Sequence, residues 1–460
     1  MSGKRQKTQY TQLRLAFASD RPGEFSVADR QGTEPLVAKR TTESPAEEEQ
    51  LMEEVCDRRN LEIAWKRVRG NKGSPGVDGL TIDETLDYLR EHWPTIREQL
   101  LEGTYSPQPV RRVEIPKPDG GVRKLGVPCV VDRLIQQALL QVLQKRWDPT
   151  FSEHSYGFRP GRSAHQAVAQ AQAYVAEGYT YVVDIDLEKF FDRVNHDRLM
   201  ARVAERVSDK RVLKLIRSFL NAGVMENGLV NPSTEGAPQG GPLSPLLSNL
   251  VLDEFDQELM RRGHRFCRYA DDSNIYVRSQ RAGERVMASV CRFLTERLRL
   301  KVNESKSAVA CPEERKFLGF TISNDGSERR ISAKALDKFK NRIRELTRGV
   351  SLAKLVEPLA RYLTGWRGYF GFCQTPRVLS NLDAWIRRRL RMNLWRQWKN
   401  GRNRFKELRQ RGVPKFRAAV AAGSPTGFWR MSGHPAVQQA LRNNYFDSIG
   451  LPRVAESSHA

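Results

Sequence analysis

The sequence lacks the features of a secreted or membrane protein. Its six cysteines are scattered without a single Cys-x-x-Cys pair, which argues against a disulfide framework and against structural zinc. No run approaches the roughly 20 apolar residues that a membrane span requires, and no apolar signal-peptide core follows the first residues. We therefore expect a soluble protein of a reducing compartment, the cytoplasm, with no membrane partner.

Acidic residues are scarce relative to basic ones. The 460 residues include 77 Lys and Arg against 54 Asp and Glu, which gives a net charge of +23. Such a chain repels itself unless a polyanion neutralises it, and nucleic acid is the polyanion that basic proteins most often bind. A basic protein without a nucleic-acid partner is the alternative that charge alone leaves open.

The length predicts several domains, because one compact core rarely extends over so many residues. Apolar spacing changes from helical to strand-like and back to helical along the chain. We expect a mobile tail at 1–50, a helix-loop-helix extension at 51–109 with its loop at 70–79, a mixed α+β domain at 110–330, a helical domain at 331–401 and a small basic region at 402–460. Within the α+β domain we expect strands at 179–187, 265–277 and 317–323, and helices at 131–147 and 199–220.

Two pairs of carboxylates stand out in the α+β domain. Asp184 and Asp186 alternate on a β-rich run, so both leave the same face of one strand. Asp271 and Asp272 interrupt two other β-rich arms, as at the tip of a hairpin. Carboxylates gathered at one place repel one another unless cations neutralise them, and a pair of Mg²⁺ ions could do so. Solvent-exposed carboxylates are the alternative for either pair alone.

The motifs around these residues resemble those of reverse transcriptases. Tyr269-Ala-Asp-Asp follows a basic and aromatic strand, and Asp186 is followed by Phe190-Phe-Asp. Viral RNA-templated RNA polymerases usually carry Gly-Asp-Asp instead. Further matching segments occur in the family's order at 115–128, 151–162, 236–249, 301–306 and 317–320, and the resemblance covers residues 55–450.

The resemblance implies an RNA-directed DNA polymerase with a right-hand fold. Fingers and palm with an antiparallel sheet would be followed by a helical thumb. The metal ligands for two Mg²⁺ ions, with Mn²⁺ as a substitute, would be Asp186, the Leu187 carbonyl, Asp271 and Asp272, while Asp184 would lie behind them. Asp186 is preferred to Asp184 because the family places an aromatic residue five positions after its catalytic Asp, here Phe191.

The same resemblance implies which residues bind the incoming dNTP. Lys117 and Arg123 would hold the triphosphate, Gln239 would contact the nucleotide and template, and Phe191 would exclude a 2′ hydroxyl. Lys306 is a candidate general acid for the pyrophosphate leaving group, with an ordinary exposed lysine as the alternative.

The C-terminal part resembles group II intron-encoded reverse transcriptases and maturases. Residues 362–370 and 382–390 match the thumb, or maturase domain, and nine Arg and two Lys fall between 381 and 413. We therefore predict that intron RNA is contacted by four arginines, Arg387, Arg388, Arg389 and Arg391. The loop at 70–79 is predicted to contact it as well. Region 402–460 is expected to bind target DNA. No cysteine follows Cys373, so we expect no HNH endonuclease of the kind many relatives append.

The sequence therefore predicts a bacterial enzyme that copies an RNA template from a DNA primer, binds its group II intron RNA, assists splicing and supports retrohoming. During integration it would be associated with the nucleoid. Two alternatives stay open: a domesticated reverse transcriptase of an anti-phage or CRISPR-associated system, and an RNA-binding maturase that acts only in splicing.

Overall fold

The computed structural model describes residues 50–116, 121–226, 229–231, 236 and 240–455. The chain divides into two compact units. The first comprises residues 1–163, 185–273 and 288–307, and the second comprises 164–184, 274–287 and 308–460. The expected tail at 1–50 lies outside the described residues except for its last position.

The first unit begins with the predicted helix-loop-helix. Its helices are α2 (Leu51–Val55), α3 (Arg58–Gly70) and α4 (Ile82–Glu102). The Asp57 side chain accepts two backbone N–H groups at the start of α3, and Thr81 forms a capping box with Glu84 at the start of α4. Gly103 ends α4 at a φ of 70°, the left-handed conformation that glycine adopts without strain. Local sequence signals thus account for these helix ends.

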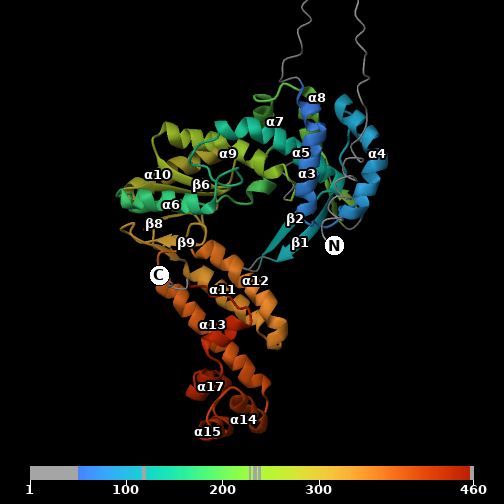
Figure 1. The fold of residues 1–460 in the computed structure, drawn as a ribbon. Helices are drawn as coiled ribbons and strands as arrows, with labels where there is room; N and C mark the ends of the chain where they lie inside the picture. The colour runs from blue at the N-terminus through green and yellow to red at the C-terminus, as the bar shows by residue number, and fades with distance from the viewer. Residues whose placement is uncertain (1–49, 117–120, 227–228, 232–235, 237–239, 456–460) are drawn as a thin grey trace, which may run out of the picture. The chain divides into compact units, whose positions relative to one another are not determined.

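A small sheet and a buried helix complete this end of the unit. The sheet has the order β2-β1-β4-β5, with strands β1 (Val110–Pro116), β2 (Val122–Val127), β4 (Val224–Glu226) and β5 (Leu229–Asn231). β1 and β2 are antiparallel, with Val113 opposite Leu125, whereas β1 and β4 are parallel. Helix α5 (Val130–Trp147) lies beside α3 (Figure 1) and is buried along most of its length, including polar residues such as Asp132 and Gln136. In its described part, the matching segment 115–128 forms an antiparallel hairpin of β1 and β2.

A second four-stranded sheet carries the paired carboxylates. Its order is β6-β7-β3-β8, with strands β3 (Tyr181–Ile185), β6 (Arg265–Tyr269), β7 (Asp272–Val277) and β8 (Ala308–Ala310). Strands β3 and β7 run from one unit into the other along the chain. The surrounding sequence forms helices α6 (Ala164–Ala176), α7 (His196–Ala204), α8 (Lys210–Asn221), α9 (Ser244–Arg261) and α10 (Gln280–Arg292). All three β-rich runs expected from the sequence contain strands.

One helix prediction is corrected. The segment 199–220, expected as a single helix, consists of the end of α7 and most of α8. Asp209 causes the break, because its side chain accepts the Arg211 N–H as the N-cap of α8. The cap starts a new helix in the middle of a continuous apolar pattern.

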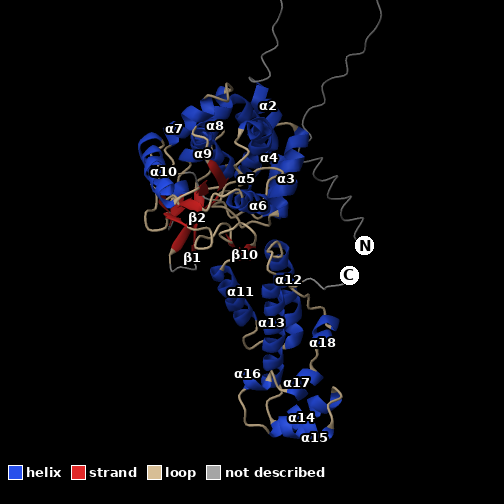
Figure 2. Cartoon of the chain, turned by 90° about the vertical axis from the view of Figure 1, so that its left-hand side faces the viewer, coloured by secondary structure: helices blue, strands red, loops and turns tan. Residues whose placement is uncertain are grey.

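The second unit is helical beyond its last described strand (Figure 2). A hairpin of β9 (Phe320–Ile322) and β10 (Arg329–Ile331) precedes α11 (Ala333–Leu346), α12 (Leu352–Phe370), α13 (Pro376–Gln397), α14 (Gly401–Gln410), α15 (Lys415–Gly423), α16 (Phe428–Met431), α17 (Pro435–Ala440) and α18 (Asn443–Ser448). Their apolar faces share one core, in which Phe339 contacts Trp366 at a ring separation of 4.3 Å and Trp395 is fully buried. The last described strand ends at Ile331, next to the position where the sequence predicts the change from strands to helices.

All six cysteines lie in described residues as thiols. Three are buried and three are half-exposed: Cys56, Cys129 and Cys267, then Cys291, Cys311 and Cys373. Burial raises the pKa of Cys56 to about 12 and of Cys129 to about 11. In the described part of the chain, helices fall short of the length and apolarity that a bilayer crossing demands.

Candidate active site

Asp186 follows the last residue of β3, and the backbone around it is held from one side. Its carbonyl accepts the Asn303 N–H at 2.8 Å, and its own N–H donates to the Ser307 hydroxyl at 3.0 Å. The next residue, Leu187, bridges to Val302. The segment 302–307 therefore continues the sheet beyond β3 and fixes the direction in which the Asp186 side chain leaves it.

The two carboxylates of this strand differ in their partners. Asp184 accepts hydrogen bonds from Nε and Nη2 of Arg315 at 2.9 and 2.6 Å, so its charge is neutralised. Asp186 is half-buried and makes no ion pair with any residue that the structure describes. An unneutralised carboxylate beside a neutralised one makes Asp186 the candidate for binding a cation.

Asp271 and Asp272 occupy the turn between β6 and β7. The turn is tight, because β6 ends at Tyr269 and β7 begins at Asp272. Ala270 has a φ of 58°, a left-handed conformation that is unusual for a residue other than glycine. β7 is hydrogen-bonded to β3, so the strand that starts at Asp272 lies beside the strand that ends just before Asp186. The expected hairpin tip is confirmed.

The carboxylates do not form a closed metal cage. Within the described ranges, no three His, Cys, Asp or Glu side chains gather closely enough to hold a metal ion. The carboxylates named from the sequence supply oxygen atoms, the ligand type that Mg²⁺ prefers. Together with the unneutralised charge of Asp186, this donor set fits a hard divalent cation.

Two further residues named from the sequence lie near Asp186: Phe191 is five positions after it along the chain, and Lys306 precedes a residue hydrogen-bonded to it. Phe191 is half-buried in the short 3-10 helix Phe190–Asp192, with its ring 5.3 Å from that of the buried Phe190. Lys306 is exposed and directly precedes Ser307, whose hydroxyl accepts the Asp186 N–H. The structure therefore connects the Lys306 turn to the strand of Asp186.

Three nucleotide-binding predictions cannot be placed. Lys117, Gln239 and the side chain of Arg123 lie outside the described residues. The residues that flank Gln239 are described: the Gly236 N–H donates to the Val194 carbonyl at 2.8 Å, and a Cβ on Gly240 would lie 2.5 Å from the Gly126 oxygen of β2.

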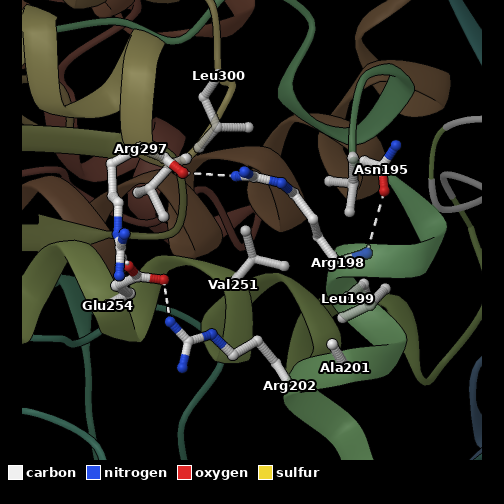
Figure 3. A pocket seen from close by; sticks show the side chains of 11 residues that line it. Asn195, Arg198, Leu199, Ala201, Arg202, Val251, Glu254, Arg297 and Leu300 are labelled. Atoms are coloured by element: carbon white, nitrogen blue, oxygen red, sulfur yellow. Dashed lines mark hydrogen bonds and ion pairs between the residues drawn. The ribbon is translucent and has the colours of Figure 1, made fainter.

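A pocket of about 260 Å³ lies between α7, α9 and residues 297–300 (Figure 3). Its floor is aliphatic, and Glu254 points between Arg202 and Arg297 and pairs with both. Arg198 donates to the Arg297 carbonyl across the pocket. The lining includes none of the carboxylates discussed above, so this pocket is separate from the candidate active site.

The arginines predicted to contact RNA are largely engaged within the second unit. Arg387 is only 2% exposed and donates to Asp447 at 2.9 Å and to the Leu451 carbonyl at 3.2 Å. Arg388 lies over the ring of Trp429, with its guanidinium carbon 4.4 Å from the ring centroid. Both therefore connect α13 to the helices that follow it.

The other two arginines have similar roles. Arg389 donates to the Thr347 hydroxyl at 2.7 Å, and Arg391 donates to the Leu441 carbonyl at 2.8 Å. Burial lowers the pKa of both guanidinium groups below the usual arginine value, as it does for Arg387. These contacts hold the helices of the unit together.

Sequence reasoning gave no role to two residues that the structure places around the motifs. Arg268 is fully buried directly before Tyr269, and His196 donates from Nε2 to the Gly236 carbonyl at 2.7 Å. Arg268 does not stand out in a strand that is basic and aromatic, and neither its burial nor its partners can be read from the sequence. His196 has no distinguishing sequence context.

Comparison with known proteins places these features in a family. Residues 115–322 match the family model described as reverse transcriptase (RNA-dependent DNA polymerase), and residues 336–412 match the group II intron, maturase-specific domain. Protein YkfC of Escherichia coli (strain K12) is 34% identical over 317 residues, which are 60% of this chain and 83% of YkfC. The group II intron-encoded protein LtrA of Lactococcus lactis subsp. cremoris is 36% identical over 208 residues, 45% of this chain but only 34% of LtrA.

Among solved structures, a partial Cas6-RT-Cas1–Cas2 complex is 25% identical over 53% of this chain and 42% of that chain. Its TM-score of 0.35 is too low to support an inference about this protein.

Residues 115–322, which include the strand before Asp186 and the hairpin with Asp271 and Asp272, match the reverse transcriptase family, so the protein is an RNA-directed DNA polymerase. The maturase-specific domain follows it along the same chain. The chain belongs to the family of group II intron-encoded reverse transcriptases and maturases.

Proposed function

We propose that this protein extends a DNA primer on an RNA template by two-metal nucleotidyl transfer, and that it acts on a group II intron RNA during splicing and retrohoming. The contrast between Asp184 and Asp186 carries the proposal for the reaction. Arg315 neutralises the first carboxylate, whereas the second makes no ion pair within the described chain. A carboxylate left unneutralised at the end of a central strand suits a cation-dependent reaction.

The metal site would consist of Asp186, the Leu187 carbonyl, Asp271 and Asp272, with two Mg²⁺ ions and Mn²⁺ as a substitute. Bound there, the ions would activate the primer 3′ hydroxyl and stabilise the leaving pyrophosphate. The protein contributes rigidity: hydrogen bonds to both backbone groups of Asp186 orient its side chain before substrate binds.

The sugar and the leaving group would be handled by the residues next to Asp186. Phe191 would place its ring beneath the deoxyribose, where a 2′ hydroxyl would clash. Lys306 would donate a proton to pyrophosphate, because its turn is attached to Asp186 through Ser307. Lys117, Arg123 and Gln239 would bind the dNTP from the fingers side.

The RNA-binding surface is proposed to extend beyond the four arginines 387–389 and 391. All four donate to groups inside the second unit. Exposed cations follow on α14, where Arg402, Lys406 and Arg409 recur at intervals of four and three residues and so share one face. This face lies within the region that matches the maturase domain, which favours intron RNA as its ligand. Residues 402–460 remain the candidate contact with target DNA, so the α14 face lies where that region overlaps the maturase match.

The reaction is tested by replacing the carboxylates of Asp186 and Asp184 with amides, one at a time. Asp186→Asn should reduce primer extension on an RNA template by roughly 10³-fold or more, because it removes a metal ligand. Asp184→Asn is the matched control, and should retain activity within about tenfold, because that side chain serves Arg315. Loss of extension in the control with retention in Asp186→Asn would refute the assignment.

A further inference from the structure

Arg268 is a buried charge next to the catalytic hairpin. It stands one residue before the Tyr-Ala-Asp-Asp motif, and neither its side chain nor that of its partner Asp256 is exposed. Asp256, on α9, accepts Nε at 2.7 Å and Nη2 at 2.5 Å, so the guanidinium plane is fixed by a bidentate pair. The remaining N–H groups are left to make other bonds.

Those N–H groups reach the turn and two neighbouring motifs. Nη1 donates to the Ala270 carbonyl at 2.9 Å and to the Asn249 side-chain oxygen at 3.0 Å, and Nη2 donates to the Ser155 hydroxyl at 2.8 Å. Ala270 is the residue in the left-handed conformation, with Asp271 directly after it. The guanidinium thus holds the carbonyl of the one strained residue in the turn.

The opposite side of the turn is closed by Gly157. The Asn249 amide donates to the Gly157 carbonyl at 2.9 Å, and a Cβ on Gly157 would lie only 2.3 Å from the Ala270 nitrogen. The segment that carries Gly157 is paired with β6, since the Tyr156 N–H donates to the Arg268 carbonyl at 2.9 Å. Backbone and side chain together enclose Ala270.

We propose that Arg268 is a positioning residue that keeps Ala270 left-handed and thereby aims Asp271 and Asp272 at the metal site, an inference that rests on the proposed role of those carboxylates. In this proposal the segment 151–162 and Asn249 support the hairpin from outside, through the hydrogen bonds of Ser155 with Arg268 and of Gly157 with Asn249.

The energetics support positioning above simple stabilisation. Burying an arginine and an aspartate costs desolvation energy that their attraction only partly returns, and apolar residues often replace such pairs without loss of stability. An apolar side chain could not donate to the Ala270 carbonyl. The buried charge therefore supplies a hydrogen-bond geometry that packing alone cannot.

The test compares Arg268→Lys with Arg211→Lys. Lysine keeps the charge but lacks the planar fork, so it cannot serve Asp256 and Ala270 together. Arg211 is a matched control in the same unit, because it is forked to Glu53 and Asp209 without contact to the hairpin. Measurements are kcat and KM for dNTP, the Mg²⁺ concentration at half-maximal rate, the Kd for primer-template, and Tm.

We expect Arg268→Lys to lower kcat by about 10²-fold, as a small misplacement of reacting groups does, and to raise the Mg²⁺ requirement. The Kd for primer-template should stay within twofold or so, and Arg211→Lys should change only Tm. Unchanged kcat and Mg²⁺ dependence in folded Arg268→Lys would overturn the proposal.

A second variant separates positioning from folding. Adding Ala270→Gly to Arg268→Lys should restore part of kcat, because glycine adopts the left-handed conformation without assistance. No recovery in the double variant would overturn the proposal. Asp271→Ala with Asp272→Ala tests the underlying function: extension that survives there refutes the carboxylate assignment itself, whereas its loss combined with a neutral Arg268→Lys refutes only the positioning role.

Discussion

Phe191 offers a direct test of sugar discrimination at the scale of a single residue. Its ring is half-buried beside Phe190, so truncation opens space without exposing the core. Phe191→Ala should increase ribonucleotide incorporation relative to deoxynucleotide by roughly 10- to 100-fold, since a steric clash with the 2′ hydroxyl is relieved. The measurement is kcat/KM for rNTP and dNTP on one RNA template. A folded, active variant with unchanged discrimination would assign the sugar gate to another residue.

The buried carboxyl of Asp132 should make the free energy of unfolding depend on pH. It is buried on α5, where it accepts the Tyr105 hydroxyl at 2.8 Å and the Gln108 N–H at 3.2 Å. Burial raises its pKa to about 7. Because the folded pKa exceeds the unfolded one, near 3.9, the stabilisation is complete below about pH 4 and is lost as pH rises through about 7.

Asp132→Asn should remove this dependence, because the amide does not titrate. Between pH 5 and pH 8 the free energy of unfolding of the wild type should therefore fall by about 2–3 kcal/mol more than that of the variant. Urea unfolding at several pH values measures the difference. Parallel curves for the two proteins would mean that Asp132 stays ionised in the folded state.

Residue assignments from sequence rest on local spacing, and the catalytic assignment stays a prediction. The five-residue interval from Asp186 to Phe191 selected Asp186 above Asp184, and the ion pair of Asp184 with Arg315 supports that choice. Arg315 lies 131 positions away, so no local pattern could reveal it. The same holds for Arg268, whose bonded partners come from three separate segments.

At the scale of elements, α14 carries the clearest basic stripe. Arg402 and Lys406 are exposed one turn apart and form no ion pair in the described chain. The double variant Arg402→Gln with Lys406→Gln should weaken intron RNA binding roughly tenfold. It should also reduce the slope of log K against log salt concentration by about 1–2, because two side chains no longer displace counterions from phosphates.

The matched control is Arg281→Gln with Arg285→Gln, which removes the same charge at the same spacing from α10. Filter binding across a salt series compares the two variants. Equal weakening by both would indicate that net charge, and no particular face, governs RNA binding.

Element prediction depended on whether boundaries were encoded locally. The loop at 70–79 was predicted from its turn residues, and the flanking helices end at caps that the sequence shows. The helix break before α8 depends on whether Asp209 turns its side chain to a backbone N–H, and the apolar repeat continues across it. The apolar periodicity therefore shows which residues are helical, but it does not show how many separate helices they form.

At the scale of the whole molecule, polymerisation and splicing assistance should depend on different surfaces. Asp271→Ala with Asp272→Ala should abolish primer extension while still accelerating splicing of the cognate intron at low Mg²⁺. The α14 variant should show the reverse, because protein cations substitute for counterions between packed phosphates. Splicing rates at low Mg²⁺ and extension on a generic template distinguish them. Loss of both activities in both variants would contradict separate surfaces.

Each domain expected from the sequence is one continuous segment, whereas each compact unit of the structure is made of three separate segments. Residues 164–184 and 274–287 belong with the C-terminal helices, although they lie within the predicted α+β domain. His165 shows why: its ring stacks on Phe372 at 4.5 Å and its Nε2 bonds the Tyr369 carbonyl at 2.8 Å. Contacts over such separations leave no compositional change at a boundary. The predicted boundaries thus remain predictions about sequence segments.

The distribution of thiols makes the protein suitable for fluorescence spectroscopy. Buried thiols with raised pKa values react slowly with maleimide dyes, because the thiolate is the reacting form. The half-exposed ones fall in both units: Cys291, whose pKa is also raised by partial burial, in the first, and Cys311 and Cys373 in the second. With Cys311→Ser, donor and acceptor dyes on Cys291 and Cys373 would report energy transfer between the units. Single molecules could then be followed as primer-template, dNTP and intron RNA are added in turn.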